Sequence, residues 1–244
     1  MQEVLFKDLG RMGYQEAWNY QESLLQENVR IKMEARRTSE DPELEASAAS
    51  GIGTTHYLLF VEHPPVYTLG KSGHEENVLI GEKEREARGV EFYRSNRGGD
   101  ITFHGPGQLV GYPILDLERF YTDIGRYLRN LEEAVILLLA DYGLRGDRSP
   151  GETGVWIDPD VKGRERKICA IGVRCSRWVT MHGLALNVNT DLGYFGNIIP
   201  CGIQGKQVTS LEKELGRPVS LEEVKARLKT HFEKVFSIHL VEEN

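Results

Sequence analysis

Cys201 is the residue whose surroundings best suit covalent chemistry. It lies in the turn-like run Pro200-Cys201-Gly202, where a thiol can be presented to a ligand. A thiolate is a strong nucleophile and can carry an acyl group, although a free cysteine is also commonly a small buried apolar residue. Cys169 and Cys175 lie in apolar, strand-like runs and fit the second description better. We therefore take Cys201 as the candidate nucleophile.

A nucleophilic thiol needs a positive charge or a base beside it, because its ordinary pKa is about 8.5. Lys167 is the first candidate, and it begins an apolar run that predicts a strand. His104 and His182 each precede a glycine and are candidate bases. A solvated lysine and ordinary hydrogen-bonded histidines are the alternatives. The spacing of these residues leaves the choice among them open.

The segment from Arg97 to Gln108 combines glycines and Pro106 with one arginine, one histidine and one glutamine. Glycine allows positive φ angles and close approach of a ligand to the main chain, and proline fixes φ within the turn. Strand-like residues flank the segment on both sides. It predicts either a loop that cradles a ligand at a sheet edge or an ordinary glycine-rich hairpin.

The order of residues in this segment resembles a known signature. The pattern Arg-Gly-Gly-x-x-Thr-Phe-His-x-x-Gly-Gln-x-x-x-Tyr, from Arg97 to Tyr112, is similar to that of the octanoyltransferases of lipoate biosynthesis, also called lipoate-protein ligase B. Between about Leu59 and Leu215, further blocks resemble the family in its order: 62–70, 167–172, 182–188, 195–202 and 208–211. The main departure is a polar insertion after the first predicted helix.

The resemblance implies a site and a reaction. It implies that Cys201 carries an octanoyl group as a thioester and that Lys167 tunes the thiol. The implied donor is octanoyl-acyl-carrier protein, the acceptors are lipoyl domains of 2-oxoacid dehydrogenase E2 subunits and the glycine cleavage H protein, and no cofactor or metal is implied. Small and apolar residues suit an acyl slot with backbone donors. Carried over by resemblance, the acyl-binding residues are Arg97, Gly98, Gly99, Asp100, Ile101, Thr102, Phe103, His104, Ala170, Ile171, Gly172, Gly183, Leu184 and Ala185.

Two alternative functions fit the same chain. One is an ATP-dependent lipoate- or biotin-protein ligase of the same superfamily, whose adenylate chemistry needs no cysteine. The other is a non-catalytic binder of acyl-carrier protein that keeps the fold. Dependence of acyl transfer on ATP distinguishes the first alternative, and a covalent octanoyl group trapped on the protein excludes the second.

Apolar periodicity predicts the elements that must position these residues. A helix is predicted over 14–36 with Tyr14, Trp18, Leu25, Val29 and Met33 on one face, and the clearest helix spans 123–142. The capping box Ser220-x-x-Glu223 opens a last helix. The segment 66–71 is predicted to run into a loop, and 74–88 to be partly helical. Strands are predicted at 5–9, 55–62, 90–96, 101–104, 109–117, 154–158, 167–175 and 179–188.

Strands and helices alternate without a regular βαβ repeat, which predicts an α+β fold: a single catalytic domain over 1–244 with a mixed central sheet and flanking helices. The polar stretch 37–53 is predicted to be an exposed loop insertion. The resemblance implies the catalytic fold of biotin and lipoate ligases, with the helices on one side of the sheet.

Composition narrows the classes of protein further. The net charge of −7 over 244 residues argues against bulk nucleic-acid binding. No apolar stretch is long enough for a membrane span, and the start of the chain lacks a leader-like pattern. Three cysteines argue against a disulfide framework, so we expect a cytoplasmic protein. The segment Lys162–Arg177 carries six basic residues and one acidic residue, which predicts either a docking surface for acidic carrier domains or a solvated charged hairpin.

Overall fold

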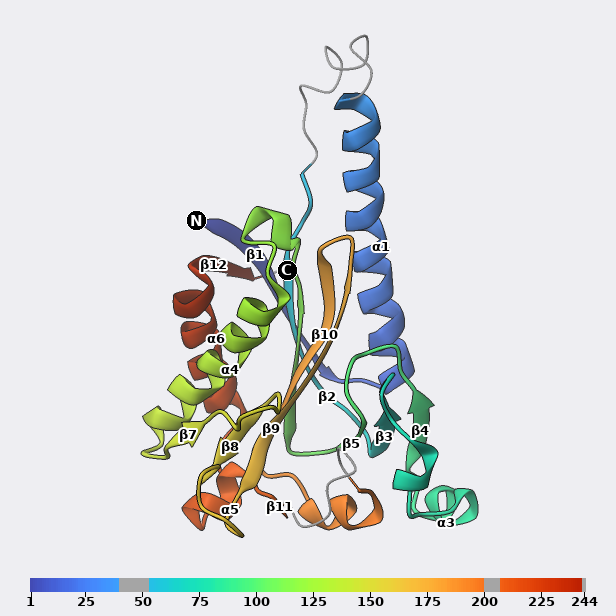
Figure 1. Ribbon diagram of the computed structural model, residues 1–244, viewed down its shortest axis with the longest axis vertical. Helices are drawn as coiled ribbons and strands as arrows, with labels where there is room; N and C mark the ends of the chain where they lie inside the picture. The colour runs from blue at the N-terminus through green and yellow to red at the C-terminus, as the bar shows by residue number, and fades with distance from the viewer. Residues whose placement is uncertain (40–52, 200–206, 243–244) are drawn as a thin grey trace.

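A central sheet organises the molecule. The computed structural model describes residues 1–39, 53–199 and 207–242. The strands are β1 (Gln2–Arg11), β2 (Tyr57–Glu62), β3 (Val66–Leu69), β4 (Glu91–Arg94), β5 (Ile101–His104), β6 (Gln108–Ile114), β7 (Gly146–Asp147), β8 (Val155–Ile157), β9 (Arg166–Ser176), β10 (Val179–Asn187), β11 (Gln207–Val208) and β12 (Ile238–Glu242). Within the described residues the main sheet has nine strands in the order β12-β1-β2-β6-β10-β9-β8-β7, with β11 beside β9 (Figure 1).

The main sheet is mixed, as the sequence predicts. Strand β1 pairs in parallel with β12 and with β2, and β11 pairs in parallel with β9. The pairs β2–β6, β6–β10, β10–β9, β9–β8 and β8–β7 are antiparallel. Strands β9 and β10 follow one another directly in the sequence. They form the longest antiparallel pair of the sheet.

Helices cover both faces of this sheet. The α-helices are α1 (Tyr14–Ser39), α3 (Glu82–Ala87), α4 (Ile124–Asp141), α5 (Leu211–Leu215) and α6 (Leu221–Phe236), and the 3-10 helices are η1 (Glu75–Asn77), η2 (Leu117–Arg119) and η3 (Leu192–Asn197). Helices α4 and α6 lie on one face, and α1 runs along the other (Figure 1). The expectation that the helices lie on one side is therefore wrong.

Strand β2 shows why both faces must be covered. Its central residues are apolar without interruption, and successive side chains of a strand point to opposite faces. Leu58 and Phe60 pack into the core with α4 and α6, whereas Leu59 and Val61 pack into the core with α1. A helix on only one face would leave two of these four side chains in water.

The predicted helices form, and their caps explain where they begin. The Asp123 carboxylate accepts a hydrogen bond from Arg126 N at 2.9 Å at the start of α4. Ser220 Oγ accepts from Glu223 N at 3.4 Å at the start of α6, as the capping box predicts. One detail of α1 differs: Met33 is 36% exposed, because the second half of the helix extends past the strands (Figure 1).

A second, smaller sheet carries the glycine-rich signature. It has the order β4-β3-β5, with β4 parallel and β5 antiparallel to β3. The sequence predicts that 66–71 runs into a loop, but Val66–Leu69 forms the central strand β3 and is buried. The loop between β4 and β5 therefore starts and ends on one rigid unit.

Two expectations concern residues outside this description. Of the insertion predicted at 37–53, residues 37–39 continue α1, and 40–52 lie outside the described residues. Cys201 also lies outside them. Among the helices of the described chain, none combines the length and apolarity that a membrane crossing requires.

Candidate active site

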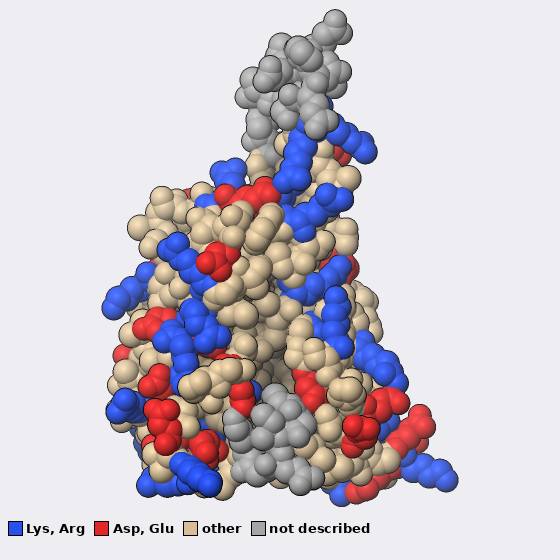
Figure 2. All heavy atoms as spheres, viewed as in Figure 1, with Lys and Arg blue, Asp and Glu red and all other residues tan. Residues whose placement is uncertain are grey.

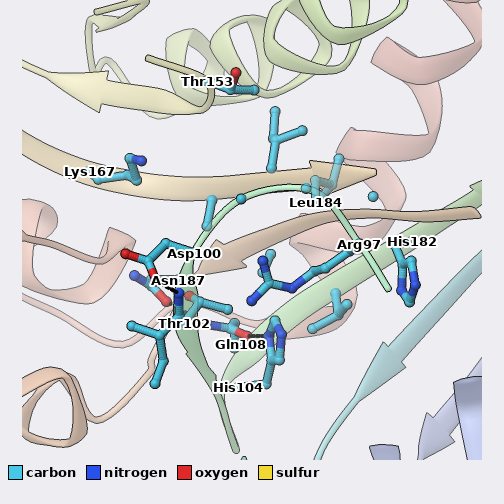
Figure 3. A pocket seen from close by; sticks show the side chains of 18 of the residues that line it. Arg97, Asp100, Thr102, His104, Gln108, Thr153, Lys167, His182, Leu184 and Asn187 are labelled. Atoms are coloured by element: carbon cyan, nitrogen blue, oxygen red, sulfur yellow. Dashed lines mark hydrogen bonds between the residues drawn. The ribbon is translucent and has the colours of Figure 1, made fainter. Parts of the chain in front are cut away.

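A cavity of about 380 Å³ lies on the α1 face of the main sheet, between β6, β10, β9 and the loop that precedes β5 (Figure 3). Lys167 lies at one end of the view and His182 at the other. Of the residues predicted for the site, these line the cavity: Arg97, Gly99, Asp100, Ile101, Thr102, His104, Lys167, Ala170, Ile171, Gly172, Gly183, Leu184 and Ala185.

Two of the predicted residues have other positions. Phe103 is not among the lining residues; its ring stacks on that of Tyr194 with 4.5 Å between centroids. Gly98 also lies outside the lining and contributes through its backbone instead. Its N–H donates to Val173 O at 2.9 Å, which docks the signature loop on β9.

Glycines are required where the loop meets the sheet. A Cβ on Gly172 would lie 2.8 Å from Gly98 O, and a Cβ on Gly70 would lie 2.2 Å from Gly99 O. Gly99 also has a φ of +84°, which other residues rarely adopt. These contacts explain physically why small residues recur along this segment: the loop backbone lies directly against β9.

Arg97 is a buried cation held by oxygen atoms of the small sheet. Its side chain is 8% exposed. One terminal nitrogen donates to Thr68 O at 2.5 Å and to Thr68 Oγ1 at 2.9 Å, and the other donates to Gly98 O at 3.0 Å. The guanidinium thus ties β3 to the loop and fixes the position of its charge.

The signature histidine belongs to a chain of hydrogen bonds. His104 Nδ1 donates to Gln108 Oε1 at 2.8 Å, and Gln108 Nε2 donates to Asn187 Oδ1 at 2.9 Å. Asn187 Nδ2 in turn donates to Thr209 O at 3.0 Å. This series of hydrogen bonds connects β5 to β6, to β10 and to the backbone that follows 200–206. It therefore fixes the side of the cavity on which Gln108 lies.

The two candidate histidines are neutral at physiological pH. Burial, followed by the nearby His63 and Arg97, holds the pKa of His104 well below its usual range. Burial, followed by Arg97, lowers the pKa of His182 to about 3. Burial also lowers the pKa of the neighbouring His63 to about 4. Neither histidine therefore supplies a positive charge to a thiolate, and their low pKa values make both of them weak bases.

An irregularity in β9 directs Lys167 into the cavity. Strand β8 pairs Trp156 with Lys167 and Val155 with Cys169, so Ile168 is an extra residue, a β-bulge. In a regular strand Lys167 would share a face with Cys169, which packs into the core with α4 and α6. Because of the bulge, Ile168 and Cys169 both enter that core, and Lys167 lines the cavity instead.

Lys167 has two partners that the sequence did not suggest. Its Nζ lies 3.9 Å from Glu152 Oε2 and 4.6 Å from the centroid of the Trp156 ring. The Lys167 and Glu152 side chains are 16% and 14% exposed. Glu152 belongs to a polar turn with no periodicity, so the sequence carried no signal for it.

Several other residues that line the cavity were not predicted from the sequence, for different reasons. Tyr14 was assigned only to the inner face of a helix, and Gly151 and Thr153 belong to the same polar turn as Glu152. Asn187, Phe195 and Val208 lie within blocks that resemble the octanoyltransferases, and that resemblance could have identified them. Phe195 and Val208 also precede and follow the segment that carries Cys201, so the chain on both sides of it borders the cavity.

The two described cysteines are poor nucleophiles. Cys169 is fully buried, and burial raises the pKa of its thiol to about 12. Burial also raises the pKa of Cys175. Both positions agree with the prediction that these cysteines are strand residues.

The basic segment Lys162–Arg177 does not form one continuous patch. Arg166 is paired with Asp158 at 2.7 Å and with Glu214 at 2.6 Å, and Arg174 is paired with Glu22 at 2.6 Å. Lys167 faces the cavity. Figure 2 shows Lys and Arg side chains spread over this face of the molecule, with Asp and Glu between them in its lower part. Pairing along β9 thus neutralises much of the charge that the sequence placed together.

The chain is similar to known proteins along nearly its whole length. The family model described as the lipoyl protein ligase A/B catalytic domain matches residues 13–233. An octanoyltransferase of Christiangramia forsetii is 59% identical over 239 residues, which are 98% of this chain and 97% of that protein. An octanoyltransferase of Flavobacterium johnsoniae is 57% identical over 240 residues, covering 98% of this chain and 99% of that protein.

Solved structures share the fold at low sequence identity. A bipartite lipoate protein ligase from Thermoplasma acidophilum superposes with a TM-score of 0.68 and 21% identity, covering 100% of this chain and 87% of that chain. A lipoate-protein ligase A crystallised with ATP gives a TM-score of 0.67 and 19% identity, covering 100% and 89%. At these identities the comparison supports the arrangement of sheet and helices alone.

Proposed function

Because this chain belongs to the octanoyltransferase family and is therefore an acyltransferase, we propose that it transfers an octanoyl group from octanoyl-acyl-carrier protein to a lysine of a lipoyl domain. The group travels as a thioester on Cys201. The observation that carries the proposal is one cavity that joins an apolar slot to a lysine ammonium. The acceptors of the octanoyl group are the lipoyl domains of 2-oxoacid dehydrogenase E2 subunits and the glycine cleavage H protein. The enzyme works in the cytoplasm.

The slot suits a medium-length acyl chain. Ile101, Val110, Ile171, Leu184 and Ala185 contribute apolar side chains to its lining, and its volume of about 380 Å³ is within the range of small-molecule sites. Each buried CH₂ group contributes roughly 0.8 kcal/mol, so an octanoyl chain gains substantial binding energy there.

The first half-reaction exchanges one thioester for another. The Cys201 thiolate attacks the carbonyl carbon of the donor, a new C–S bond forms, and the C–S bond to the carrier breaks. The carrier sulfur leaves as a thiolate and takes a proton from the Lys167 ammonium, which becomes a neutral amine. Lys167 stabilises the attacking thiolate by its positive charge. Because the bond formed equals the bond broken, the step needs no ATP.

The second half-reaction makes the amide. The neutral amine of the acceptor lysine attacks the thioester carbon, the C–N bond forms, and the Cys201 thiolate leaves. The attacking nitrogen must lose one proton, and Lys167 in its amine form accepts it. This transfer returns Lys167 to the ammonium form beside the regenerated thiolate.

Two other functions make different predictions. An ATP-dependent lipoate or biotin ligase of the same superfamily would require ATP for acyl transfer and would tolerate loss of Cys201. A non-catalytic binder of acyl-carrier protein would never carry a covalent octanoyl group. Phe195 and Val208, which precede and follow the segment that carries Cys201, line the same cavity as Lys167, and this favours the thioester route.

Intact-mass measurement tests the proposal directly. The purified protein is incubated with octanoyl-acyl-carrier protein without ATP, and so is the Cys201→Ala variant. We expect an octanoyl adduct on the first protein and none on the second, and a lipoyl domain should then remove the adduct. Absence of the adduct without ATP, or an equal adduct on Cys201→Ala, contradicts the proposal.

A further inference from the structure

Glu152 lies on a turn that the fold holds firmly. The turn connects β7 to β8 and contains Gly151 and Gly154, with φ angles of +78° and +119°. A Cβ on Gly154 would lie 2.5 Å from Cys169 O, so the turn backbone lies directly against β9. Glu152 N donates to Ser149 O at 3.1 Å, which closes the turn.

A buried carboxylate anchors this turn to helix α4. Gly154 N donates to Glu132 Oε1 at 2.9 Å, and the Glu132 side chain is fully buried. Glu132 is in turn paired with Arg148 at 3.0 Å and with Arg129 at 2.8 Å. A fully buried carboxylate with two cationic partners is costly to move, since breaking such a pair leaves an uncompensated buried charge. The backbone beneath Glu152 is therefore fixed.

The same short segment surrounds the side chain of Lys167. Trp156 places its ring 4.6 Å from Nζ, and Glu152 places Oε2 3.9 Å from it. A lysine has a flexible four-carbon stem and loses considerable rotamer entropy when it is held in one place. Contacts from a rigid turn reduce the conformations that Lys167 can adopt at the end of the cavity.

We propose that Glu152 is a positioning residue: its carboxylate holds the Lys167 ammonium at the end of the acyl cavity, in the orientation that acyl transfer requires. The inference rests on the proposed function, because it assumes that Lys167 acts in the transfer. It adds a residue that acts through Lys167 and not on the substrate itself. The contact that carries this role is the 3.9 Å pair between Glu152 Oε2 and Lys167 Nζ.

A double-mutant cycle tests this role. The four proteins are the unmodified enzyme, Glu152→Gln, Lys167→Ala and the double variant, each followed by intact mass in a single turnover with octanoyl-acyl-carrier protein. We expect Glu152→Gln to slow acyl-enzyme formation about tenfold, or about 1.4 kcal/mol in the barrier, while Lys167 is present. With Lys167→Ala as the background, the same substitution should change the rate less than about twofold, because the group it positions is gone.

Matched variants separate positioning from charge and from folding. Glu86→Gln removes one negative charge from an exposed position on α3 and should leave the rate unchanged. Glu152→Asp keeps the charge on a shorter side chain, so its rate should lie between those of the unmodified enzyme and the Glu152→Gln variant. Thermal unfolding of each variant shows whether the fold is intact.

The outcomes are distinct. An equal loss of rate from Glu152→Gln in both backgrounds, or no loss in either, overturns the positioning role. Absence of an octanoyl adduct on the unmodified enzyme contradicts the proposed function itself. The failure of the proposed function is therefore distinguishable from the failure of the positioning role.

Discussion

Arg97 and Lys167 both line the cavity, and the protein holds them by different kinds of partner. Arg97 donates to a backbone carbonyl of β3, to the Thr68 hydroxyl and to its own loop. Lys167 faces a carboxylate at 3.9 Å and the ring of Trp156, both from a neighbouring turn and strand. A guanidinium remains charged and fixed in such a fork, whereas an amine on a flexible stem can gain and lose a proton.

The difference assigns different work to the two regions. The Arg97 region is built to keep one shape: its histidines are buried and neutral, and its loop backbone lies against β9. In the proposed reaction the Lys167 region exchanges charge and protons; Lys167 reaches the cavity through a bulge, and the partners named above are side chains. We therefore expect substitutions near Lys167 to affect rates, and substitutions near Arg97 to affect stability and acyl binding.

The largest effect should come from Cys201→Ala. Removal of the thiol leaves no atom to carry the acyl group, so transfer from octanoyl-acyl-carrier protein to a lipoyl domain should fall to background. Cys169→Ala and Cys175→Ala should retain activity, since burial raises the pKa of both thiols. The measurement is the octanoylation of a lipoyl domain by intact mass. Retained transfer in Cys201→Ala would contradict the thioester route.

Lys167→Ala should have the next largest effect, and it should be a kinetic one. Loss of a nearby positive charge raises the apparent pKa of a thiol, so alkylation of Cys201 should require higher pH and acyl-enzyme formation should slow by about 10²- to 10³-fold, within the usual contribution of acid–base catalysis. Thermal unfolding should change little. An unchanged pH profile for alkylation would assign Lys167 a structural role.

Arg97→Lys is the corresponding test of the other region. A lysine cannot reproduce the fork to Thr68 O, Thr68 Oγ1 and Gly98 O, so buried acceptors lose their partners. Hydrogen bonds to charged groups are worth about 1.5–3 kcal/mol, and we expect the free energy of unfolding to fall by about that amount. Urea unfolding measures it. If stability stayed unchanged while the acylation rate fell, the division of labour between Arg97 and Lys167 would be wrong.

The neutral histidines predict how stability depends on pH. Burial lowers the folded-state pKa of His63 to about 4, below the unfolded value of about 6.5. The unfolded state therefore binds more protons below pH 6.5, and stability is complete above that pH and is lost as pH falls toward 4. The loss should reach about 1.4 kcal/mol near pH 5.5 for this residue.

A His63→Gln variant isolates that contribution. The variant should be less stable than the unmodified protein at about pH 7.5, and this deficit should shrink as the pH falls to about 5. The reason is that only the unmodified protein loses stability from keeping a buried histidine neutral at low pH. Urea unfolding at several pH values within this range provides the measurement. A deficit that is constant with pH would mean that His63 titrates alike in the folded and unfolded states.

The long elements could be predicted from the sequence, and the irregular ones could not. Helices α4 and α6 are strongly periodic and capped, and β10 is mostly apolar, so local pattern determines them. The short strand β3 follows Pro64 and Pro65, which indicate a turn, and its four residues are strand only because neighbouring strands pair with it. Strand β12 is partly exposed at the sheet edge and depends on its pairing with β1.

The same limit applies to the site. The signature loop and the candidate residues Lys167 and Cys201 could be found because chemistry restricts their residue types and the family resemblance fixes their order. The bulge at Ile168 and the approach of Glu152 to Lys167 arise from pairing between β8 and β9, which local composition does not encode. Residues that act through tertiary placement were therefore missed.

The smallest effect should come from the exposed charges beyond the Lys167 region. Arg166 is unsuitable for reversal because it is paired with Asp158 and Glu214. Lys162 is exposed and is suitable. Arg164 is also suitable because it is 69% exposed, although it forms an ion pair with Asp158 at 3.3 Å. We expect Lys162→Glu with Arg164→Glu to raise KM for octanoyl-acyl-carrier protein about two- to threefold at low salt, because exposed charges steer encounter and are screened over about 8 Å at physiological salt. Activity with a small octanoyl thioester should not change, since that donor bypasses docking. If KM and its salt dependence match those of the unmodified enzyme, carrier proteins dock elsewhere. In that case Lys162 and Arg164 have no part in binding the donor.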